Sequence, residues 1–416
     1  MSTPKQTIAI LHYATAPVVG GVESTITYHA RGLTALGFPV RVVSGSGGLY
    51  EDTYETHINP LFGSTHPSVL AVKRELDAGC VPDDFEAVVA QVEAALRQAL
   101  DKCAICIAHN VPTLHKNLPL TVALQRLHAG GVVRVIAWCH DLAWANTQYL
   151  PELHEGYPWD VLRERWHGAR YVTVSDARQR ELSTLLGMPE GEIAVVLPGV
   201  DPAQFLHWTS TMKVLDRRLN LLDADGLLLV PARLTRRKNI SLALRILAEV
   251  RRQSGRDFRL IVTGPPGPHN PANPGYLGEL LELRDQLGIT DAAHFLYAYG
   301  HGDKPLIPDD ATMANLFQMA DALVFPSLQE GFGIPILEAG LVSLPVFCAD
   351  IPPFQATGQQ DVTYFDSVSG SPEAIAAQIL ETLTASSVYR LRLRVRQQYR
   401  WDVIIRERIL PLLEEH

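Results

Sequence analysis

The chain has 416 residues, of which 47% are hydrophobic and 19% charged, and its mean hydropathy is close to zero. This length is too great for one ordinary core, so two or three folded domains are expected. The formal net charge is −9; residues 1–200 carry 15 basic and 20 acidic side chains, and residues 201–416 carry 21 and 25. Neither half has the basic excess typical of proteins that bind nucleic acids or anionic membranes, which disfavours both classes of partner.

Strand-like and helix-like segments alternate along the first half of the chain. Strands are predicted at 7–14, 39–46, 104–108, 132–138 and 171–174, and helices at 22–36, 68–77, 83–100, 119–128 and 176–186. The segment 193–202 reads as a strand that ends in turn residues, and it is the candidate junction between two domains. Continuous apolar strands alternating with helices are typical of a parallel sheet that is covered on both faces.

The alternation restarts after this junction. Strands are predicted at 227–231, 259–263, 294–297, 322–325, 346–348 and 363–365, and helices at 241–252, 277–287, 312–319, 336–342, 372–383, 389–399 and 401–413. Residues 264–276 are rich in proline and glycine and are expected to form a surface loop that shapes a specific pocket. The pattern predicts an α/β protein with two facing Rossmann-like domains, parallel sheets and a cleft between them. Ligands in such sheets bind beyond the carboxyl ends of the strands.

Five cysteines, an odd number in a large chain, favour free thiols and a reducing compartment. Cys103 and Cys106 form a CxxC pattern in an apolar run; residues three apart on a strand face opposite sides, so core thiols are expected rather than a metal or redox site. Residues 1–6 lack the apolar core of a signal peptide, and no apolar run reaches the length of a membrane span. A cytoplasmic protein without an integral membrane segment is therefore predicted.

The most informative segment is 321–339, where a strand ends near Pro326 and Pro335 lies in the first turn of the next helix. The free amides at 333–336 and the positive end of the helix dipole favour a phosphate or another anion. Glu330, before the helix, and Glu338, expected in its first turn, can border one cleft, where carboxylates suit sugar diols. Alternatively, Glu338 only complements the helix dipole and Glu330 belongs to a solvated loop.

A second segment, 231–240, again predicts a strand, a loop and a helix. Arg233 follows the strand directly and Lys238 stands at the helix entrance, which provides two cations for a pyrophosphate. The alternative is a basic surface turn, and Arg236 and Arg237 are expected to be its solvated members.

The pattern Arg233-x4-Lys238, followed by Glu330-Gly-Phe-Gly-x-Pro-x-x-Glu338, resembles retaining glycosyltransferase family 4, the glycosyltransferase group 1 enzymes with the GT-B fold. The resemblance covers essentially the whole chain. It implies that Arg233 and Lys238 hold the donor diphosphate and that Glu338 binds the ribose hydroxyls. It also implies that Glu330 orients the donor sugar together with the backbone of Gly331, Phe332, Gly333 and Ile334. Arg233, Lys238 and Glu330 are thereby expected to serve catalysis as well as binding.

Weaker matches lie in the first half of the chain. Gly20 and Gly21 resemble the family's N-terminal glycine loop near the diphosphate. His140 resembles a histidine that lies against the donor sugar, and it is expected to serve catalysis. The alternatives are an ordinary strand–helix turn and a strand-end histidine with a structural hydrogen bond; His109 is a similar, weaker case. The family's usual glycine after the lysine is Asn239 here, which is expected to cap the helix instead.

The resemblance implies transfer of a hexose from a nucleoside diphosphate sugar to an acceptor hydroxyl with retention of configuration, without a metal or another cofactor. Front-face attack and a covalent intermediate both remain open. It assigns residues 1–200 to the acceptor and 201–395 to the donor, with a C-terminal helix at 396–416 that packs back on the N-terminal domain.

The charge of the first half slightly favours a small soluble sugar or metabolite as acceptor over an anionic lipid surface. Two alternatives stay open: another GT-B enzyme that processes sugar nucleotides or performs phosphorolysis, and a sugar-nucleotide-binding protein without activity. A nicotinamide dehydrogenase is disfavoured, because residues 17–22 do not fit the G-x-G-x-x-G pattern.

Overall fold

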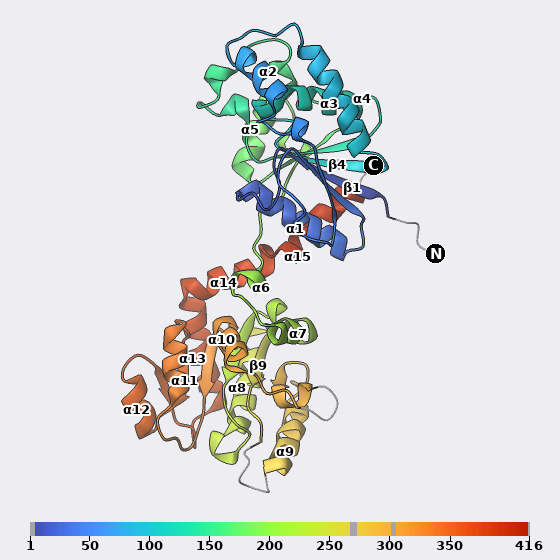
Figure 1. Ribbon diagram of the computed structural model, residues 1–416. Helices are drawn as coiled ribbons and strands as arrows, with labels where there is room; N and C mark the ends of the chain where they lie inside the picture. Colours follow the sequence, from blue (N-terminus) through green and yellow to red (C-terminus); the bar gives the residue numbers. More distant parts are fainter. Residues whose placement is uncertain (1–4, 267–272, 301–304, 415–416) are drawn as a thin grey trace. The chain divides into compact units, whose positions relative to one another are not determined.

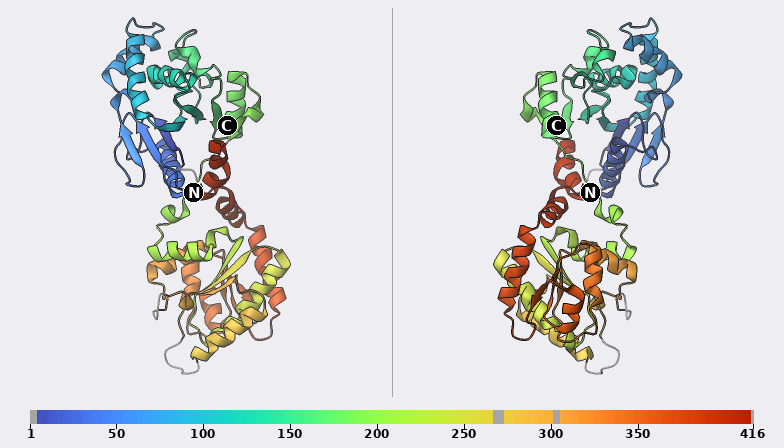
Figure 2. Two further views of the ribbon diagram at one scale, coloured as in Figure 1. Left: turned by 90° about the vertical axis from the view of Figure 1, so that its right-hand side faces the viewer. Right: turned by 90° about the vertical axis from the view of Figure 1, so that its left-hand side faces the viewer.

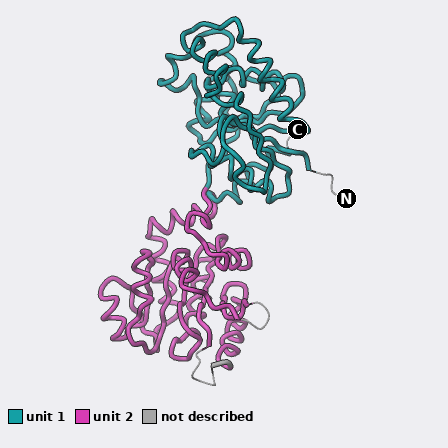
Figure 3. The backbone as a smooth tube through the Cα atoms, viewed as in Figure 1, with its two compact units in different colours: residues 1–199, 399–416 teal, residues 200–398 magenta. Residues whose placement is uncertain are grey.

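The computed structural model of the protein describes residues 5–266, 273–300 and 305–414, with the backbone alone for 273 and 274. The chain divides into two compact units (Figure 3). Unit 1 comprises residues 1–199 and 399–416, and unit 2 comprises residues 200–398. In each unit the strands form a central layer between helices (Figures 1 and 2).

Unit 1 contains a seven-stranded parallel sheet in the order β3-β2-β1-β4-β5-β6-β7. Its strands are β1 (Thr7–His12), β2 (Val40–Ser44), β3 (Glu55–Ile58), β4 (Cys103–His109), β5 (Arg134–Cys139), β6 (Arg170–Thr173) and β7 (Ile193–Val195). The helices are α1 (Gly21–Ala35), α2 (Pro67–Asp77), α3 (Phe85–Ala99), α4 (Leu118–Ala129), α5 (Asp176–Leu186), α15 (Trp401–Ile404) and α16 (Leu410–Glu414). A π-helical turn, Ile405–Ile409, joins the last two.

Both faces of this sheet are buried, as the apolar strands predict. In β1, Ala9 and Leu11 belong to one hydrophobic cluster, whereas Ile8 and Ile10 belong to another that includes residues of the C-terminal helices. The C-terminal segment packs closely on α1: a Cβ atom at Gly32 would lie 2.0 Å from Cδ1 of Ile405. Glycine at position 32 therefore permits this helix contact.

Unit 2 contains a six-stranded parallel sheet in the order β10-β9-β8-β11-β12-β13. Its strands are β8 (Gly226–Val230), β9 (Phe258–Val262), β10 (Ala293–Phe295), β11 (Ala322–Phe325), β12 (Val346–Ala349) and β13 (Thr363–Phe365). The helices are α6 (Pro202–Phe205), α7 (Ser210–Leu219), α8 (Ile240–Ser254), α9 (Asn273–Gln286), α10 (Asp310–Met319), α11 (Ile334–Leu341), α12 (Pro352–Gly358), α13 (Pro372–Ala385) and α14 (Ser387–Gln398).

The strand orders place one topological switch point in each sheet. In unit 1 the chain continues from β1 to β2 on one side and returns to β4 on the other; in unit 2 the same happens around β8 and β11. The loops that follow two such neighbouring strands diverge, and the crevice between them is the usual ligand position in open parallel sheets. The predicted α/β class with two Rossmann-like halves is thus confirmed.

Some elements differ from the sequence-based expectation. Strand β3 and helices α7 and α12 were not anticipated; β3 is a partly exposed edge strand and lacks the apolar run of a buried one. Helix α9 begins at Asn273, so the expected loop at 264–276 was wrong for its last residues, and 267–272 lie outside the described residues. The expected strand at 294–297 ends at Phe295 and continues as a 3-10 turn.

Candidate functional site

The predicted donor-binding residues of unit 2 lie in the loops that follow β8 and β11, on the two sides of the switch point. These loops are joined by their backbones, because the Leu328 amide donates to the Arg237 carbonyl oxygen at 2.8 Å. Two segments about ninety residues apart are thereby fixed against one another at the carboxyl edge of the sheet, where ligands of such sheets bind.

Glu330 is the centre of a polar cluster in these loops. Its carboxylate accepts hydrogen bonds from the Lys238 ammonium, from Ser327 Oγ at 2.9 Å and from Arg237 Nη1 at 3.1 Å. The Lys238 and Glu330 side chains are only 12% and 10% exposed, so their ion pair is largely shielded from solvent. Burial lowers the pKa of Lys238, and the Glu330 carboxylate opposes that shift. The pairing therefore keeps a partly buried ammonium charged.

Arg233 is exposed and lies in the loop after β8, which also carries Lys238. Its positive charge contributes to lowering the pKa of Lys238, so the two cations are within electrostatic reach of one another. Among the residues that the structure describes, no side chain binds the Arg233 guanidinium. Arg233 and Lys238 thus form a cationic pair, as predicted, in which one member is paired with Glu330 and the other is open.

Arg236 and Arg237 differ, although both were expected to be solvated. Arg236 pairs with Glu279 of α9 and lies over the Tyr276 ring, 5.0 Å from its centroid. Arg237 is half-exposed, but its guanidinium donates to the Gln329 carbonyl oxygen at 3.0 Å as well as to Glu330. Both side chains are exposed, as expected, but each is also paired with a carboxylate. Arg237 is the site residue that sequence reasoning missed.

Gly333 is the N-cap of α11 and has φ +98°, a left-handed conformation that favours glycine. A Cβ atom there would lie 2.8 Å from the Phe354 ring. Pro335 stands in the first turn as predicted but has no amide hydrogen, and the Ile336 amide donates to the Gly333 carbonyl oxygen at 2.9 Å. Of the backbone amides at 333–336 that were expected to bind an anion, only those of Gly333 and Ile334 therefore remain candidates.

Glu338 is the fifth residue of α11 and lies in its second turn, not in the first turn as expected. This position weakens the interpretation that Glu338 merely complements the helix dipole, which acts mainly within the first turn. The side chain is exposed, and none of the described residues binds its carboxylate. The structure thus brings Lys238 and Glu330 into contact, whereas Glu338 and Arg233 have no side-chain partner within 5–266, 273–300 and 305–414.

Asn239 follows Lys238 in the left-handed region, with φ +50°. Its side chain makes no capping hydrogen bond to α8 and donates instead to the Ser367 carbonyl oxygen at 2.9 Å, so the expected capping role was wrong. Asparagine is among the few residues that adopt this conformation readily, which explains why it can replace glycine here.

In unit 1, histidines gather at the β1–β4 switch point. His12 Nδ1 lies 2.7 Å from the His109 carbonyl oxygen, and His109 Nδ1 lies 2.8 Å from His140 Nε2. Burial lowers the pKa of His12 and His109 and lowers that of His140 to about 4. All three rings are therefore neutral at pH 7, and His140 is suited to hydrogen bonding rather than to carrying a positive charge.

The His140 backbone is held by its neighbour. The Asn110 side-chain oxygen accepts from the His140 amide at 2.8 Å and from the Asp141 amide at 3.1 Å. These bonds favour a structural position for His140, which as a residue is partly exposed. The weaker candidate His109 is bonded directly to it.

Gly20 and Gly21 stand at the beginning of α1, after β1. Gly20 is the helix N-cap, and no side chain caps this end. A Cβ atom at Gly20 would lie 2.1 Å from the Glu23 carboxylate, which itself approaches His12 Nε2 at 4.0 Å. Glu23 thus links Gly20 to His12 at the carboxyl edge of the unit 1 sheet, whereas a Cβ atom at Gly21 would meet no atom within 4 Å.

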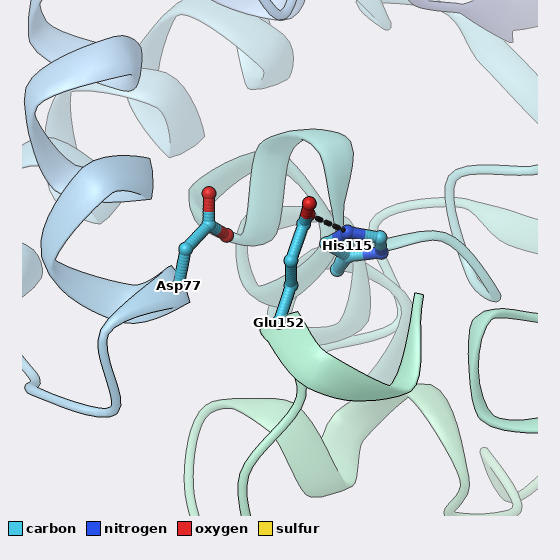
Figure 4. A group of neighbouring side chains, drawn as sticks. All are labelled: Asp77, His115 and Glu152. Atoms are coloured by element: carbon cyan, nitrogen blue, oxygen red, sulfur yellow. Dashed lines mark hydrogen bonds and ion pairs between the residues drawn. The ribbon is translucent and has the colours of Figure 1, made fainter. Parts of the chain in front are cut away.

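A possible metal-ligand set elsewhere in unit 1 consists of Asp77, His115 and Glu152 (Figure 4). His115 Nε2 lies 2.7 Å from the Glu152 carboxylate. The Lys73 ammonium lies 2.7 Å from Asp77 and 3.0 Å from Glu152, and so supplies a cation to both carboxylates. We interpret this set as an ion-pair cluster that joins α2 to the loops around 115 and 152.

The five cysteines are free, and Cys103 and Cys106 are buried in β4, which confirms the expected core thiols. The expectation that they face opposite sides was wrong, because the pairing register shifts after Cys103 and both residues belong to one hydrophobic cluster. Over the described parts of the chain, no helix combines the length and apolar character needed to cross a bilayer.

Comparison with known proteins matches both halves of the chain. Residues 213–400 match the family model for glycosyl transferases group 1, and residues 19–204 match that for glycosyltransferase family 4. An uncharacterized glycosyltransferase of Methanocaldococcus jannaschii is 24% identical over 252 residues, which are 59% of this chain and 60% of the relative. Mannosylglucosylglycerate synthase of Petrotoga mobilis is 23% identical over 265 residues, 60% of each protein.

D-inositol 3-phosphate glycosyltransferase of Nocardia farcinica is 27% identical over 183 residues, 44% of this chain and 38% of the relative. The matched segments thus span less than two thirds of these relatives' lengths. Among solved structures, a glycosyltransferase from Rickettsia africae is 16% identical over the whole of both chains, with a TM-score of 0.39.

Proposed function

The chain belongs to glycosyltransferase family 4, within the group 1 glycosyltransferases, and we propose that it transfers a hexose from a nucleoside diphosphate sugar to an acceptor hydroxyl with retention of configuration. The observation that carries this proposal is the contact of Lys238 with Glu330 at the β8–β11 switch point, beside the open guanidinium of Arg233. This contact supports the proposal, because it would bring cations for a leaving diphosphate next to a carboxylate for sugar hydroxyls.

The charge of this cluster fits a sugar diphosphate. In the cluster around Glu330, Arg233, Arg237 and Lys238 contribute three positive charges and Glu330 one negative charge, which leaves two positive charges against the two negative charges of a diphosphate diester; Glu338, proposed for the ribose, does not belong to this cluster. Arg236 is excluded from this balance because Glu279 neutralises it. The chain's own side chains thus suffice to offset the donor charge, and the proposed reaction requires no metal or other cofactor.

Lys238 and Arg233 would stabilise the charge that develops on the departing diphosphate, together with the Gly333 and Ile334 amides. When Lys238 turns to the phosphate, Arg237 and Ser327 still hold Glu330. Glu330 then accepts hydrogen bonds from the sugar, while Phe332 and Gly331 supply the loop backbone that borders it. The exposed Glu338 carboxylate is free to accept the ribose hydroxyls.

Several hydrogen bonds to one carboxylate also make Glu330 a weak nucleophile. A carboxylate that still accepts hydrogen bonds from Arg237 and Ser327 while Lys238 binds the phosphate loses electron density that attack on the anomeric carbon would need. This favours front-face attack, in which the leaving phosphate accepts the proton of the acceptor hydroxyl, over a covalent intermediate on Glu330.

We assign binding of the acceptor to unit 1. Gly20, Gly21 and His140 are proposed to contribute to binding of the donor. The acceptor proposed is a small polar metabolite rather than a lipid. Two relatives support this by their names, mannosylglucosylglycerate synthase and D-inositol 3-phosphate glycosyltransferase, which specify small polar molecules.

The test is release of nucleoside diphosphate from UDP-glucose, UDP-galactose and GDP-mannose, measured by chromatography with and without candidate sugars, glycerate derivatives and inositol phosphates. The proposal expects release that depends on an acceptor and a product whose anomeric configuration, read by NMR, equals that of the donor. Release with inorganic phosphate or from the donor alone would instead indicate a phosphorolytic or sugar-nucleotide-processing enzyme. Binding without any release would indicate a protein that only binds sugar nucleotides.

A further inference from the structure

A second cationic surface lies in unit 2, where the end of α13 meets α14 (Figure 1). A hollow of about 310 Å³ opens there, and three of its lining side chains are arginines: Arg256, Arg390 and Arg394. Thr384, Gln397 and Gln398 add a hydroxyl and two amides to the lining. We call this feature the arginine hollow.

The lining contains no carboxylate side chain. In the described part of the chain, neither Arg256 nor Arg394 takes part in an ion pair. The nearby Arg251 and Arg252, by contrast, are paired with Asp257 and Glu249. Carboxylates thus neutralise arginines beside the arginine hollow, but no carboxylate of the described residues neutralises Arg256 or Arg394 in its lining.

Two further residues, Arg390 and Asp225, affect the charge in and near the arginine hollow. Arg390 is fixed by bonds from its Nη1 to the carbonyl oxygens of Thr384 and Ala385, which end α13. The neighbouring Asp225 carboxylate already accepts from Gln397 Nε2 at 2.8 Å and from the Asp257 amide at 2.9 Å. Its negative charge offsets part of the cationic excess, but it does not line the hollow.

The arginine hollow lies at the opposite edge of the sheet from Glu330. Helix α14 is bonded to the residues that precede two strands: Tyr389 Oη donates to the Asp225 carbonyl oxygen at 2.8 Å, and Arg396 pairs with Asp321 at 2.8 Å. Asp225 and Asp321 stand directly before β8 and β11, and Arg256 lies two residues before β9. The hollow is therefore separated from the proposed donor site by the length of the strands.

We propose that the arginine hollow binds a phosphorylated small metabolite of the sugar phosphate class. Guanidinium groups bind phosphate through paired hydrogen bonds, and the hydroxyl and amide groups suit sugar hydroxyls. The volume is at the lower end of small-molecule sites and exceeds what an inorganic phosphate needs. A concave site with these donors favours a small ligand over an anionic membrane, although Val388 and Leu391 of α14 are exposed.

The experiment is isothermal titration of the full chain with glucose 6-phosphate, inorganic phosphate and glucose at low ionic strength, because exposed charges are screened by salt. Arg256→Ala and Arg394→Ala are compared with Arg245→Ala, a control for an exposed arginine of α8 that has no ion pair among the described residues. Arg233→Ala reports on the proposed donor site.

Glucose 6-phosphate is expected to bind the wild type, Arg245→Ala and Arg233→Ala alike, and to bind Arg256→Ala and Arg394→Ala about tenfold more weakly or worse. Glucose should not bind through the arginine hollow. Four results would overturn the proposal. These are equal affinity for inorganic phosphate, which means an adventitious ion only; loss in Arg233→Ala alone; no binding at all; and Arg394-dependent sedimentation with phosphatidylglycerol vesicles in place of metabolite binding.

Discussion

Lys238 and Glu330, 92 residues apart in the sequence, form an ion pair at the carboxyl edge of the unit 2 sheet. The loop after β8 carries the lysine and the loop after β11 carries the glutamate, so the contact exists only because these strands are neighbours in the sheet. Arg237 reinforces the contact from the same loop as Lys238. The predictions for the donor site follow from this arrangement.

Arg237→Ala is expected to lower kcat/KM for the donor about tenfold, because Glu330 loses a hydrogen bond that remains when Lys238 binds phosphate. Arg236→Ala is the matched control, since that side chain pairs with Glu279 outside the site. Arg237→Lys keeps the positive charge but not the geometry of the guanidinium. It should therefore recover only part of the loss if the position of the hydrogen bond matters as well as the charge. Steady-state kinetics with varied donor measure this, and equal activity of the two alanine variants would contradict a positioning role.

Lys238→Ala and Arg233→Ala are each expected to lower kcat by about 10²–10³, since each removes a cation from the leaving diphosphate. Lys238→Ala also removes the shielded cation beside the largely buried Glu330 carboxylate and leaves only the half-exposed Arg237 to compensate its charge, so thermal stability should fall, whereas that of Arg233→Ala should not. Turnover assays and melting curves on the same preparations separate the two effects. Normal turnover in both variants would refute the diphosphate assignment.

Glu338→Gln is expected to weaken nucleoside diphosphate binding about tenfold while leaving the melting temperature unchanged. The carboxylate is exposed and has no partner among the described residues, so its removal costs the folded chain little. Titration calorimetry with UDP and GDP tests the affinity. Binding as tight as in the wild type would remove Glu338 from the ribose site.

Acid is expected to destabilise unit 1 through its buried histidines. Burial lowers the pKa of His29 to about 3, and both of its ring nitrogens lack a hydrogen-bond partner. A lowered folded-state pKa means that the unfolded chain binds the proton more readily, so stability is complete above the unfolded pKa and falls as pH decreases below it. For His29 this loss is about 2 kcal/mol at pH 5.

His29→Leu, a replacement of similar volume, tests this linkage. The variant should be about as stable as the wild type at pH 8, because no hydrogen bond is lost. Between pH 8 and pH 5 its free energy of unfolding, measured with urea, should fall by about 2 kcal/mol less than that of the wild type. Parallel pH profiles would show that His29 is not neutral in the folded chain.

Lys73→Met tests the ion-pair interpretation of the Asp77–His115–Glu152 cluster. Without the ammonium, two partly buried carboxylates lose their shared cation, and a destabilisation of about 1–2 kcal/mol is expected. Hydrogen bonds from Lys73 and His115 lower the pKa of Glu152, so this stabilisation is present above the unfolded pKa and is lost as pH falls. Zn²⁺ should raise the melting temperature of the variant more than that of the wild type. Equal or larger stabilisation of the wild type would indicate a metal site instead.

The sequence predicts the parallel sheets well, because buried strands are continuous apolar runs such as 227–230 and 322–325. It fails at Glu55–Ile58, an edge strand with no such run. It also identifies the loops of Arg233 and Glu330, since polar residues that follow apolar strands stand out.

Contacts between side chains that are far apart in the sequence could not be predicted. Nothing local to Arg237 indicates that Glu330 lies beside it and that Arg236 is directed to Glu279. The same holds for the histidine cluster, whose members come from β1, α1, β4 and the end of β5. Such contacts depend on strand order, which composition and periodicity leave open.

The return of the chain into unit 1 affects how the protein is made. A hydrophobic cluster of residues before 200 is completed by the C-terminal residues Trp401, Ile404, Ile405, Ile409, Leu412 and Leu413. During synthesis on the ribosome, the hydrophobic core of residues 1–199 therefore stays incomplete until the C-terminal segment emerges, after unit 2 has been translated. Unit 2 is continuous and can fold first, and a nascent chain halted near residue 398 would hold an unfinished N-terminal core that chaperones can recognise.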